Sequence, residues 1–430
     1  MTAEKTFETI DVYEQRAEAG GIWKHTPDLT SDDQFKVPQT SPFGSLEKPA
    51  WKSGVSQLPK GAVQDSRKYS KDPEFLSPIY DRLETNIPRS LMRFSDHAFP
   101  DKCQLFPKHE EVEEYLKSYA KEVRHLIKFC TQISDIRLAP PTSNNATDVN
   151  KSSDKWVITS LSLPDSEQSE EIYDAVILAN GHFAVPYVPD IPGIKEWGKT
   201  YPGSITHAKY YRRPQPYQGK KVIVVGNSAS GLDIGTQIAS ICAQPLLMSS
   251  KSASYLAAGF PGLESKLDVP PISSFNVKTK TVHFEDGREE RDVDAIVFCT
   301  GYFYSFPFLP GLQDSPYPLI KTGKRVCNTY KHLFYAPHPT LSLLALNQKI
   351  IPFPIAEAQS AVLARVYSGR LPLPSFDDMR AWEESVLEQL GEKGEGNFHE
   401  LQFPRDAEYI NELCDWAASA KGEGGKTAQR

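Results

Sequence analysis

One short segment limits the possible folds of this chain more than any other part of the sequence. Val222 to Val225 is a continuous apolar run typical of a buried strand, and Leu232 to Cys242 has helical periodicity. Between them lies Gly226-Asn227-Ser228-Ala229-Ser230-Gly231, in the strand-to-helix context of a dinucleotide-binding G-x-G-x-x-G turn. The first glycine permits the tight turn, the last lets the helix pack closely on the strand, and a pyrophosphate rests on the helix N-terminus. We therefore expect a parallel α/β unit that binds a dinucleotide at this loop.

One position of the loop departs from the pattern. Ser228 stands where the fingerprint has its middle glycine. A side chain there makes the backbone slightly less free to approach a pyrophosphate. An ordinary strand-to-helix turn is the alternative interpretation of the segment.

Strand and helix signals alternate along the rest of the chain. Apolar runs predict strands, and a period of 3.6 residues predicts helices. This alternation indicates the α/β class, with parallel sheets that carry helices on both faces. The expected strands are 10–13, 126–138, 155–163, 173–178, 246–248, 282–284 and 293–298, and the expected helices are 106–120 and 374–390.

Composition and charge exclude several classes of protein. Apolar residues make up 39% of the chain and charged residues 24%, a balance typical of a folded globular protein. The formal net charge of −7 argues against a nucleic-acid partner. No apolar run is long enough for a transmembrane anchor, and the N-terminus lacks the apolar core of a signal peptide. The six cysteines include no C-x-x-C pair, so we expect reduced thiols, no metal site and a cytoplasmic protein.

The strand after the glycine loop indicates which dinucleotide binds. About 20 residues beyond the loop, an acidic residue favours NAD and a basic residue favours the 2′-phosphate of NADP. This chain has Ser249-Ser250-Lys251-Ser252 there. Because no carboxylate is present and Lys251 can pair with a phosphate, we expect NADP. A solvated surface lysine is the alternative for Lys251.

Glu14 raises the same question near the N-terminus. It follows the strand at 10–13 and precedes Gly20-Gly21-Ile22-Trp23. A ribose-binding acid lies about 20 residues after the last glycine of its own fingerprint, which places that glycine upstream of Met1. We therefore expect the chain to begin inside a dinucleotide-binding unit, after the first strand and phosphate loop of that unit. The alternative is that Glu14 is only a surface acid.

Several segments together resemble the flavin-containing monooxygenases, particularly their fungal members. They match that family's second-strand segment, its L-x-T-N-x-P segment, a Phe-Pro landmark before a helix, its F-x-G-x-x-x-H-x-x-x-[FY] run, its A-T-G-Y hinge and a C-terminal landmark. In this sequence they are Glu14 to Trp23, Leu83 to Pro88, Phe106-Pro107, Tyr201 to Tyr211, Cys299 to Tyr302 and Pro352 to Gln359. Tyr201 replaces the family's Phe, and Cys299 replaces its Ala. The resemblance covers about residues 10 to 415.

The resemblance implies two Rossmann-like domains, the smaller NADP domain being inserted in the FAD domain. We expect residues 1–200 to form the first part of the FAD domain, 201–298 the NADP domain, and 299–430 the second part of the FAD domain with the C-terminal helices. FAD and NADP are the implied cofactors. NADPH would reduce FAD, O2 would form a C4a-hydroperoxide on the flavin, and one oxygen atom would pass to a soft nitrogen or sulfur of a small molecule.

The resemblance also implies roles for individual residues. Asn86 is the expected catalytic side chain, because an amide can position the flavin and NADP⁺ without adding charge or acid. His207 and Tyr211 are expected to stabilise the linker between the domains. The expected cofactor-binding residues are Glu14, Gly21, Trp23, Asn86, Asn180, Gly181, Gly226, Ser228, Ser230, Gly231, Lys251, Thr300 and Gly301.

The expected absence of a first fingerprint has an energetic consequence. That strand would be central in its sheet, and losing five or six buried apolar residues would cost about 8–18 kcal/mol, at about 1.5–3 kcal/mol each. A whole domain is stable by only about 5–15 kcal/mol. We therefore expect the FAD domain of this chain to fold poorly and to bind FAD weakly.

Other functions stay open at this point. A Baeyer–Villiger monooxygenase has a Trp followed by Pro or Asp where this chain has Tyr211-Arg212, which argues against it. A plain NADPH-dependent reductase would need no T-N-x-P segment. A non-catalytic, truncated NADP-binding product is a third alternative. The substrate and the oligomeric state, including a homodimer, are left undecided by the sequence.

Overall fold

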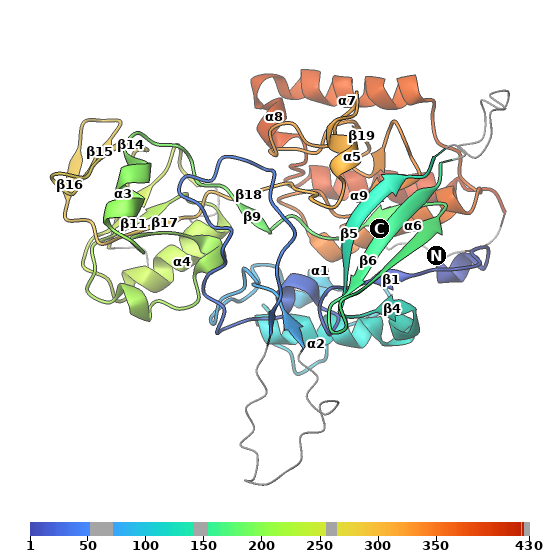
Figure 1. Ribbon diagram of the computed structural model, residues 1–430, viewed down its shortest axis with the longest axis horizontal. Coiled ribbons are helices and arrows are strands. Elements are labelled where there is room, and N and C mark those ends of the chain that lie inside the picture. The colour runs from blue at the N-terminus through green and yellow to red at the C-terminus, as the bar shows by residue number, and fades with distance from the viewer. Residues whose placement is uncertain (52–71, 141–153, 255–264, 423, 425–430) are drawn as a thin grey trace, which may run out of the picture.

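The fold has two lobes, which Figure 1 shows side by side. The computed structural model describes residues 1–51, 72–140, 154–254, 265–422 and 424. The smaller lobe is coloured green to yellow and comes from the middle of the chain, whereas the larger lobe combines segments from both ends. The middle of the chain is therefore inserted between two parts of the larger lobe.

The smaller lobe is built on a five-stranded parallel sheet. Its strands are short and largely buried, because side chains of both faces are covered. Their order in the sheet is β10 (Ile205–His207), β17 (Ala295–Phe298), β11 (Val222–Val225), β12 (Leu246–Ser249) and β13 (Lys266–Val269).

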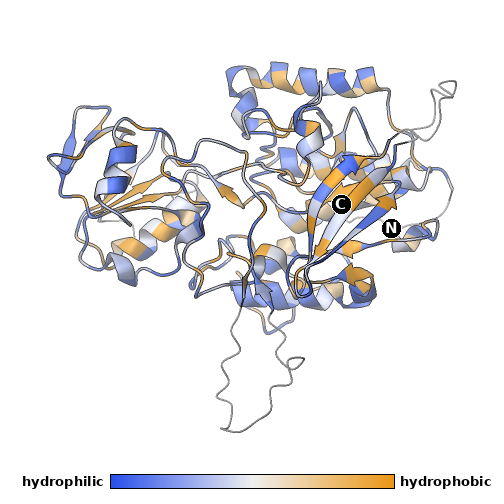
Figure 2. Cartoon of the chain, in the orientation of Figure 1, coloured by the Kyte–Doolittle hydropathy of each residue, from blue (hydrophilic) through white to orange (hydrophobic). Residues whose placement is uncertain are grey.

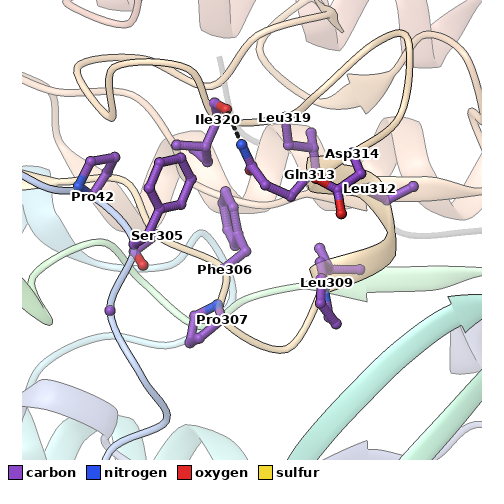
Figure 3. Close-up of a pocket in the computed structure, with 13 residues that line it drawn as sticks. Pro42, Ser305, Phe306, Pro307, Leu309, Leu312, Gln313, Asp314, Leu319 and Ile320 are labelled. Carbon is purple, nitrogen blue, oxygen red and sulfur yellow. Dashed lines mark hydrogen bonds between the residues drawn. The ribbon is translucent and has the colours of Figure 1, made fainter.

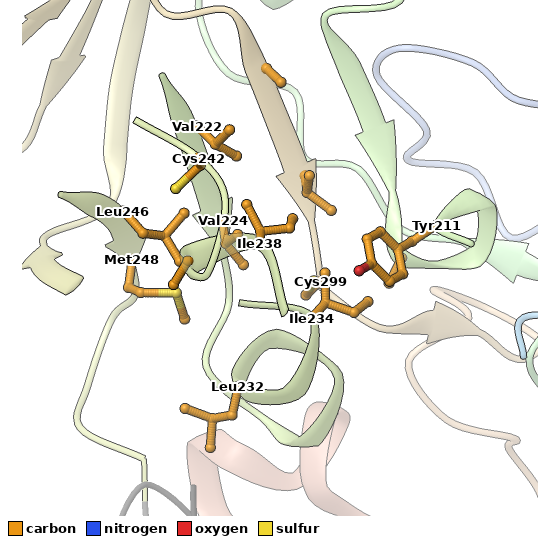
Figure 4. Close-up of a cluster of buried hydrophobic side chains, with 14 of the residues drawn as sticks. Tyr211, Val222, Val224, Leu232, Ile234, Ile238, Cys242, Leu246, Met248 and Cys299 are labelled. Carbon is orange, nitrogen blue, oxygen red and sulfur yellow. The ribbon is translucent and has the colours of Figure 1, made fainter. Parts of the chain in front are cut away.

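Alternate residues of these strands supply two separate cores. Val222 and Val224 pack with apolar residues of α4 (Ala229–Ala239), as Figure 4 shows. Ile223 points to the other face and packs with Trp197 of α3 (Ile194–Thr200). This two-residue alternation is what a strand buried on both faces requires. The second face also carries an antiparallel sheet of β14 (Ile272–Asn276), β15 (Thr281–Phe284) and β16 (Glu289–Arg291).

The larger lobe contains several smaller sheets. One is a four-stranded sheet in which only the β21–β8 pair is parallel, and another is the parallel pair β1–β4. The antiparallel sheet of β5, β6 and β7 lies beside them in Figure 1. The bounds are β1 (Val12–Tyr13), β2 (Ala50–Trp51), β3 (Pro73–Glu74), β4 (Ile127–Lys128), β5 (Thr131–Leu138), β6 (Trp156–Ser162), β7 (Glu167–Tyr173), β8 (Val176–Leu178), β19 (Thr329–Tyr330), β20 (Phe334–Tyr335) and β21 (Leu341–Leu343).

Helices of the larger lobe come mostly from the C-terminal part of the chain. In α6 and α9, apolar residues gather on the faces that pack against each other and against Leu333 and Phe334. The side chain of Ser375 caps α7 by accepting a hydrogen bond from the backbone of Asp378 at 3.2 Å. The bounds are α1 (Arg89–Met92), α2 (His109–Tyr119), α5 (Pro310–Gln313), α6 (Pro352–Tyr367), α7 (Phe376–Leu390), α8 (Gly394–Asn397) and α9 (Arg405–Ala418).

Hydropathy follows this architecture. In Figure 2 the central strands of the parallel sheet, β11 and β17, are hydrophobic, whereas the long helix α7 alternates between hydrophobic and hydrophilic residues. Within the described ranges, no helix has both the length and the apolar character that crossing a bilayer requires.

The chain passes between the lobes twice, and the two passages pair with each other. Strand β9 (Val185–Pro186) leads into the smaller lobe and β18 (Tyr302–Phe303) leads out of it. They form an antiparallel pair at the centre of Figure 1. The two connections are thereby held together as one hinge region.

The α/β class is confirmed, whereas three local expectations are wrong. The run 126–138 is not one strand, because a turn at residues 129 and 130 separates β4 from β5. The run 173–178 is not one strand, because Tyr173 ends the antiparallel strand β7 and β8 starts only at Val176. An apolar run does not reveal that the chain changes direction within it. Helix α4 begins at Ala229 instead of at residue 232, so the last glycine of the loop lies inside the helix.

Two strands of the larger lobe that pair in parallel, β1 and β8, lie at the edges of their sheets. Among the described residues, β1 pairs only with β4, and β8 lies at the end of its four-stranded sheet. Val12 of β1 is 42% exposed and Ile177 of β8 is 37% exposed, which is high for apolar strand residues.

The expectation from the sequence that this chain binds FAD weakly stays a prediction.

Candidate active site

The glycine loop between β11 and α4 has the close contacts that a dinucleotide fingerprint needs. Gly226 has φ +104°, and a Cβ there would lie 2.5 Å from the backbone oxygen of Cys299. A Cβ at Gly231 would lie 2.0 Å from the backbone oxygen of Gly226. Glycine is therefore required at both ends of the loop, at the turn and where the helix meets the strand.

The start of α4 is suited to an anion. Ser228 is the N-cap residue, but its side chain makes no capping hydrogen bond, and the first turn contains no acidic residue. The first-turn backbone N–H groups and the helix dipole favour a negative group at such an end. Ser228 and Ser230 thus lie where the pyrophosphate of a dinucleotide is expected.

Lys251 lies near this loop. It is the second residue after β12 and is exposed. The side chain of Asn227 donates to the backbone oxygen of Ser252 at 2.6 Å, which holds the segment of Lys251 beside the glycine loop. Lys251 therefore lies in a segment that is held beside the glycine loop.

Glu14 follows β1, as the sequence predicts. Its backbone N–H donates to Lys128 and its backbone oxygen accepts from Thr131, so β4 and the start of β5 fix its position. Its carboxylate accepts from the backbone N–H of Arg16 at 2.8 Å. Burial raises the pKa of Glu14, and the hydrogen bond from Arg16 opposes that rise.

Trp23 and the Asn86 segment lie on the same part of the larger lobe. Trp23 ends a short 3₁₀ turn, and it packs with Ile87 against the buried cluster that contains Tyr115 and Phe353. Asn86 itself is exposed. Its segment is held by the backbone hydrogen bond from Thr85 to Pro107, at 2.9 Å. The Asn86 amide is therefore solvent-accessible on a fixed backbone.

The two crossings between the lobes are tied at Gly301. The backbone oxygen of Gly301 accepts from the N–H of Tyr187 at 2.9 Å and from Nε2 of His207 at 3.1 Å. The hydroxyl of Thr300 donates to the backbone oxygen of Tyr187. At the other crossing, the side chain of Asn180 turns back to the Gly181 oxygen at 3.1 Å.

His207 is a structural histidine. Because Nδ1 accepts from the backbone N–H of Lys209, Nε2 carries the proton that it donates to Gly301. Burial lowers the pKa of His207 to about 3, so the ring is neutral at physiological pH. It therefore holds the linker and does not act as an acid or base there.

Three candidate glycines border open space. Gly21, Gly181 and Gly301 have φ of +55°, +70° and +82°, and a Cβ at any of them would meet nothing within 4 Å. Each backbone is thus accessible to a ligand. No neighbouring side chain occupies the space beside these three glycines.

The chain is similar to proteins of known family. The chain matches the family described as "Flavin-binding monooxygenase-like" over residues 67–260 and 269–421. The chain belongs to this family. It is 37% identical over 343 residues to "Flavin-containing monooxygenase FMO GS-OX-like 1" of Arabidopsis thaliana, covering 76% of this chain and 68% of the relative.

Two further relatives support this assignment. The "Thiol-specific monooxygenase" of Saccharomyces cerevisiae is 33% identical over 312 residues, covering 70% of this chain and 68% of the relative. The structure of S-allyl-L-cysteine S-oxygenase from Allium sativum aligns with a TM-score of 0.72 at 27% identity, covering 96% of this chain and 84% of that chain. This flavin-containing monooxygenase therefore shares both sequence and fold with enzymes of the family, and a flavin is the cofactor that the family implies.

The residues present fit part of a flavin nucleotide. Glu14, Trp23 and the open backbones of Gly181 and Gly301 are available to the ribose and the ring. Within the described ranges, the loop at Gly226 is the one glycine-rich turn from a strand directly into an α-helix, and those ranges show no second such turn for a flavin pyrophosphate. Among the described residues, no group of three or more His, Cys, Asp or Glu side chains is placed to hold a metal ion.

Sequence reasoning missed a buried charged network behind the hinge of this monooxygenase. Lys209 is 3% exposed, and its Nζ contacts Asp32 Oδ2 at 3.0 Å and the backbone oxygen of Ala184 at 2.7 Å. The hydroxyl of Tyr210 donates to Asp32 Oδ1 at 3.0 Å. Lys209 lies between Ala208 and Tyr210, and nothing in the sequence identifies Asp32 as its partner.

One pocket lies apart from these residues. It has a volume of about 350 Å³, and Figure 3 shows its mainly apolar lining between Pro42 and the segment from Ser305 to Ile320. None of the predicted site residues lines it. The pocket therefore does not identify the cofactor site.

Proposed function

We propose that this monooxygenase uses NADPH to oxygenate sulfur in a small thiol or thioether. The observation that carries the NADPH part is the glycine loop before α4, with Lys251 beside it and no carboxylate in Ser249 to Ser252. The proposal includes two Rossmann-like domains, with the NADP domain at 201–298 between FAD-domain parts at 1–200 and 299–430. These boundaries agree with a parallel sheet whose strands run from Ile205 to Phe298.

The sulfur part rests on the relatives. The yeast protein is named a thiol-specific monooxygenase, and the garlic protein is named an S-allyl-L-cysteine S-oxygenase. Both align with most of this chain. The sequence motifs imply a soft nitrogen or sulfur nucleophile, which includes thiols and thioethers, whereas a ketone substrate is disfavoured by Tyr211-Arg212.

The residues of this chain would bind and orient the reactants. A bound flavin would supply the transfer of one oxygen atom from O2. Glu14 would hold a ribose, the first turn of α4 would hold the NADP pyrophosphate, and Lys251 would pair with the 2′-phosphate. The Asn86 amide would fix the orientation of the reacting groups while adding no ionisable proton.

A substrate panel tests this proposal. NADPH oxidation by the purified chain with excess FAD is expected to increase with a thioether or a thiol, and not with a cyclic ketone. NADH is expected to be a poorer donor, and Lys251→Ala should raise the KM for NADPH without changing that for NADH. Stimulation by the ketone alone would indicate a Baeyer–Villiger enzyme. No oxidation with any compound would support a non-catalytic NADP-binding protein.

A further inference from the structure

A partly buried hydrogen bond joins α4, the helix after the glycine loop, to the segment that carries Asn86. Tyr80 is 5% exposed, and its hydroxyl donates to Oδ2 of Asp233. Asp233 lies on α4, five residues beyond the N-cap residue Ser228. Two parts of the chain with separate predicted roles, α4 and the Asn86 segment, therefore meet at this hydrogen bond.

The carboxylate of Asp233 also accepts a hydrogen bond from Gln237. Gln237 Nε2 donates to Asp233 Oδ1 at 3.3 Å, and the Tyr211 hydroxyl donates to Gln237 Oε1 at 3.0 Å. The Tyr80 and Tyr211 rings meet edge to face, with centroids 5.3 Å apart. Burial raises the pKa of Tyr80 well above its usual value, and the negative charge of Asp233 adds to that rise, so the phenol stays protonated and donates.

A short turn leads from Tyr80 toward Asn86. The backbone N–H of Leu83 donates to the oxygen of Tyr80 at 3.0 Å, and the Leu83 side chain packs against the core that contains Leu232 and Ile234 of α4. Thr85 then bonds to Pro107. Movement of α4 would therefore reach the Asn86 backbone through the Tyr80–Asp233 contact and the five residues between Tyr80 and Asn86, which begin with this turn.

We propose that Tyr80 is a positioning residue that couples dinucleotide binding at α4 to the placement of Asn86. This inference rests on the proposed use of NADPH. The ligand would hold the first turn of α4, and the Tyr80–Asp233 hydrogen bond would then hold the turn that precedes Asn86. Coupling between two sites of a protein typically amounts to a factor of about 5–150 in affinity.

Hydrogen exchange with and without NADP⁺ tests the coupling, and it needs no flavin. The Leu83 and Thr85 amides are the reporters because both donate backbone hydrogen bonds. In the wild-type chain, saturating NADP⁺ is expected to slow exchange at both amides by about tenfold. Tyr80→Phe is expected to abolish this slowing, while NADP⁺ still binds with an affinity reduced by no more than about tenfold.

Matched variants separate coupling from a general loss of structure. Tyr211→Phe removes a hydroxyl from the same network but leaves the Tyr80–Asp233 bond, so NADP⁺ should still slow the exchange. Asp233→Ala removes the bond from the helix side and should reproduce the effect of Tyr80→Phe. Equal slowing by NADP⁺ in Tyr80→Phe and the wild type would overturn the proposal. Calorimetry that finds no NADP⁺ binding to the wild type would instead refute the proposed use of NADPH.

Discussion

Gly231→Ala is expected to lower kcat/KM for NADPH by about 100-fold, the size of effect that a displacement near 1 Å produces. A Cβ at this position would lie 2.0 Å from the backbone oxygen of Gly226. Because the obstacle is backbone, no side-chain rotation relieves it. Helix α4 must move away from β11, and its N-terminus then no longer meets the pyrophosphate. Steady-state kinetics with varied NADPH measures the effect.

Gly311→Ala is the matched control for this substitution. Gly311 is also helical, and a Cβ there would meet nothing within 4 Å. Its kinetics should therefore equal those of the wild type. If Gly231→Ala bound and used NADPH as well as the control, the assignment of the glycine loop to the dinucleotide would be wrong.

Lys209→Met is expected to lower the free energy of unfolding by about 3–5 kcal/mol, the cost of removing one partner from a buried ion pair. The side chains of Lys209 and Asp32 are only 4% and 22% exposed, with Nζ and Oδ2 at 3.0 Å. The substitution leaves the Asp32 carboxylate with the Tyr210 hydroxyl as its remaining side-chain partner. Urea denaturation followed by fluorescence measures the change, and adding Asp32→Asn should recover part of the loss.

Lys48→Met provides the comparison for this ion pair. Lys48 pairs with Asp33, the neighbour of Asp32, but both side chains are largely exposed, at 73% and 60%. Exposed pairs contribute little to stability, so the urea midpoint should not change. Equal midpoints for Lys209→Met and Lys48→Met would show that the buried network does not hold the hinge.

The local part of the site could be predicted from the sequence. The strand, the glycine loop and the helix lie within about twenty consecutive residues, and each has its own pattern of apolar residues and glycine. Periodicity and turn chemistry therefore predicted β11, the loop and most of α4, with an error of three residues at each end of the helix. The motif context also predicted that Glu14 follows a strand.

Contacts between distant segments could not be predicted in this way. Lys209 and Asp32 are 177 residues apart, and Tyr80 and Asp233 are 153 residues apart. None of these four residues lies in a pattern that names its partner, because the pairing arises only when the two lobes pack. The same limit explains the error at 173–178, where an apolar run hides the change from antiparallel β7 to β8.

The origin of the oxygen atom in the product tests the central claim most directly. The chain would be incubated with excess FAD, NADPH and a thioether under ¹⁸O2, with catalase present to remove free peroxide. The account predicts a sulfoxide that forms only with NADPH and carries one ¹⁸O atom. NADPH consumption without sulfoxide, or a sulfoxide whose oxygen comes from water, would contradict it.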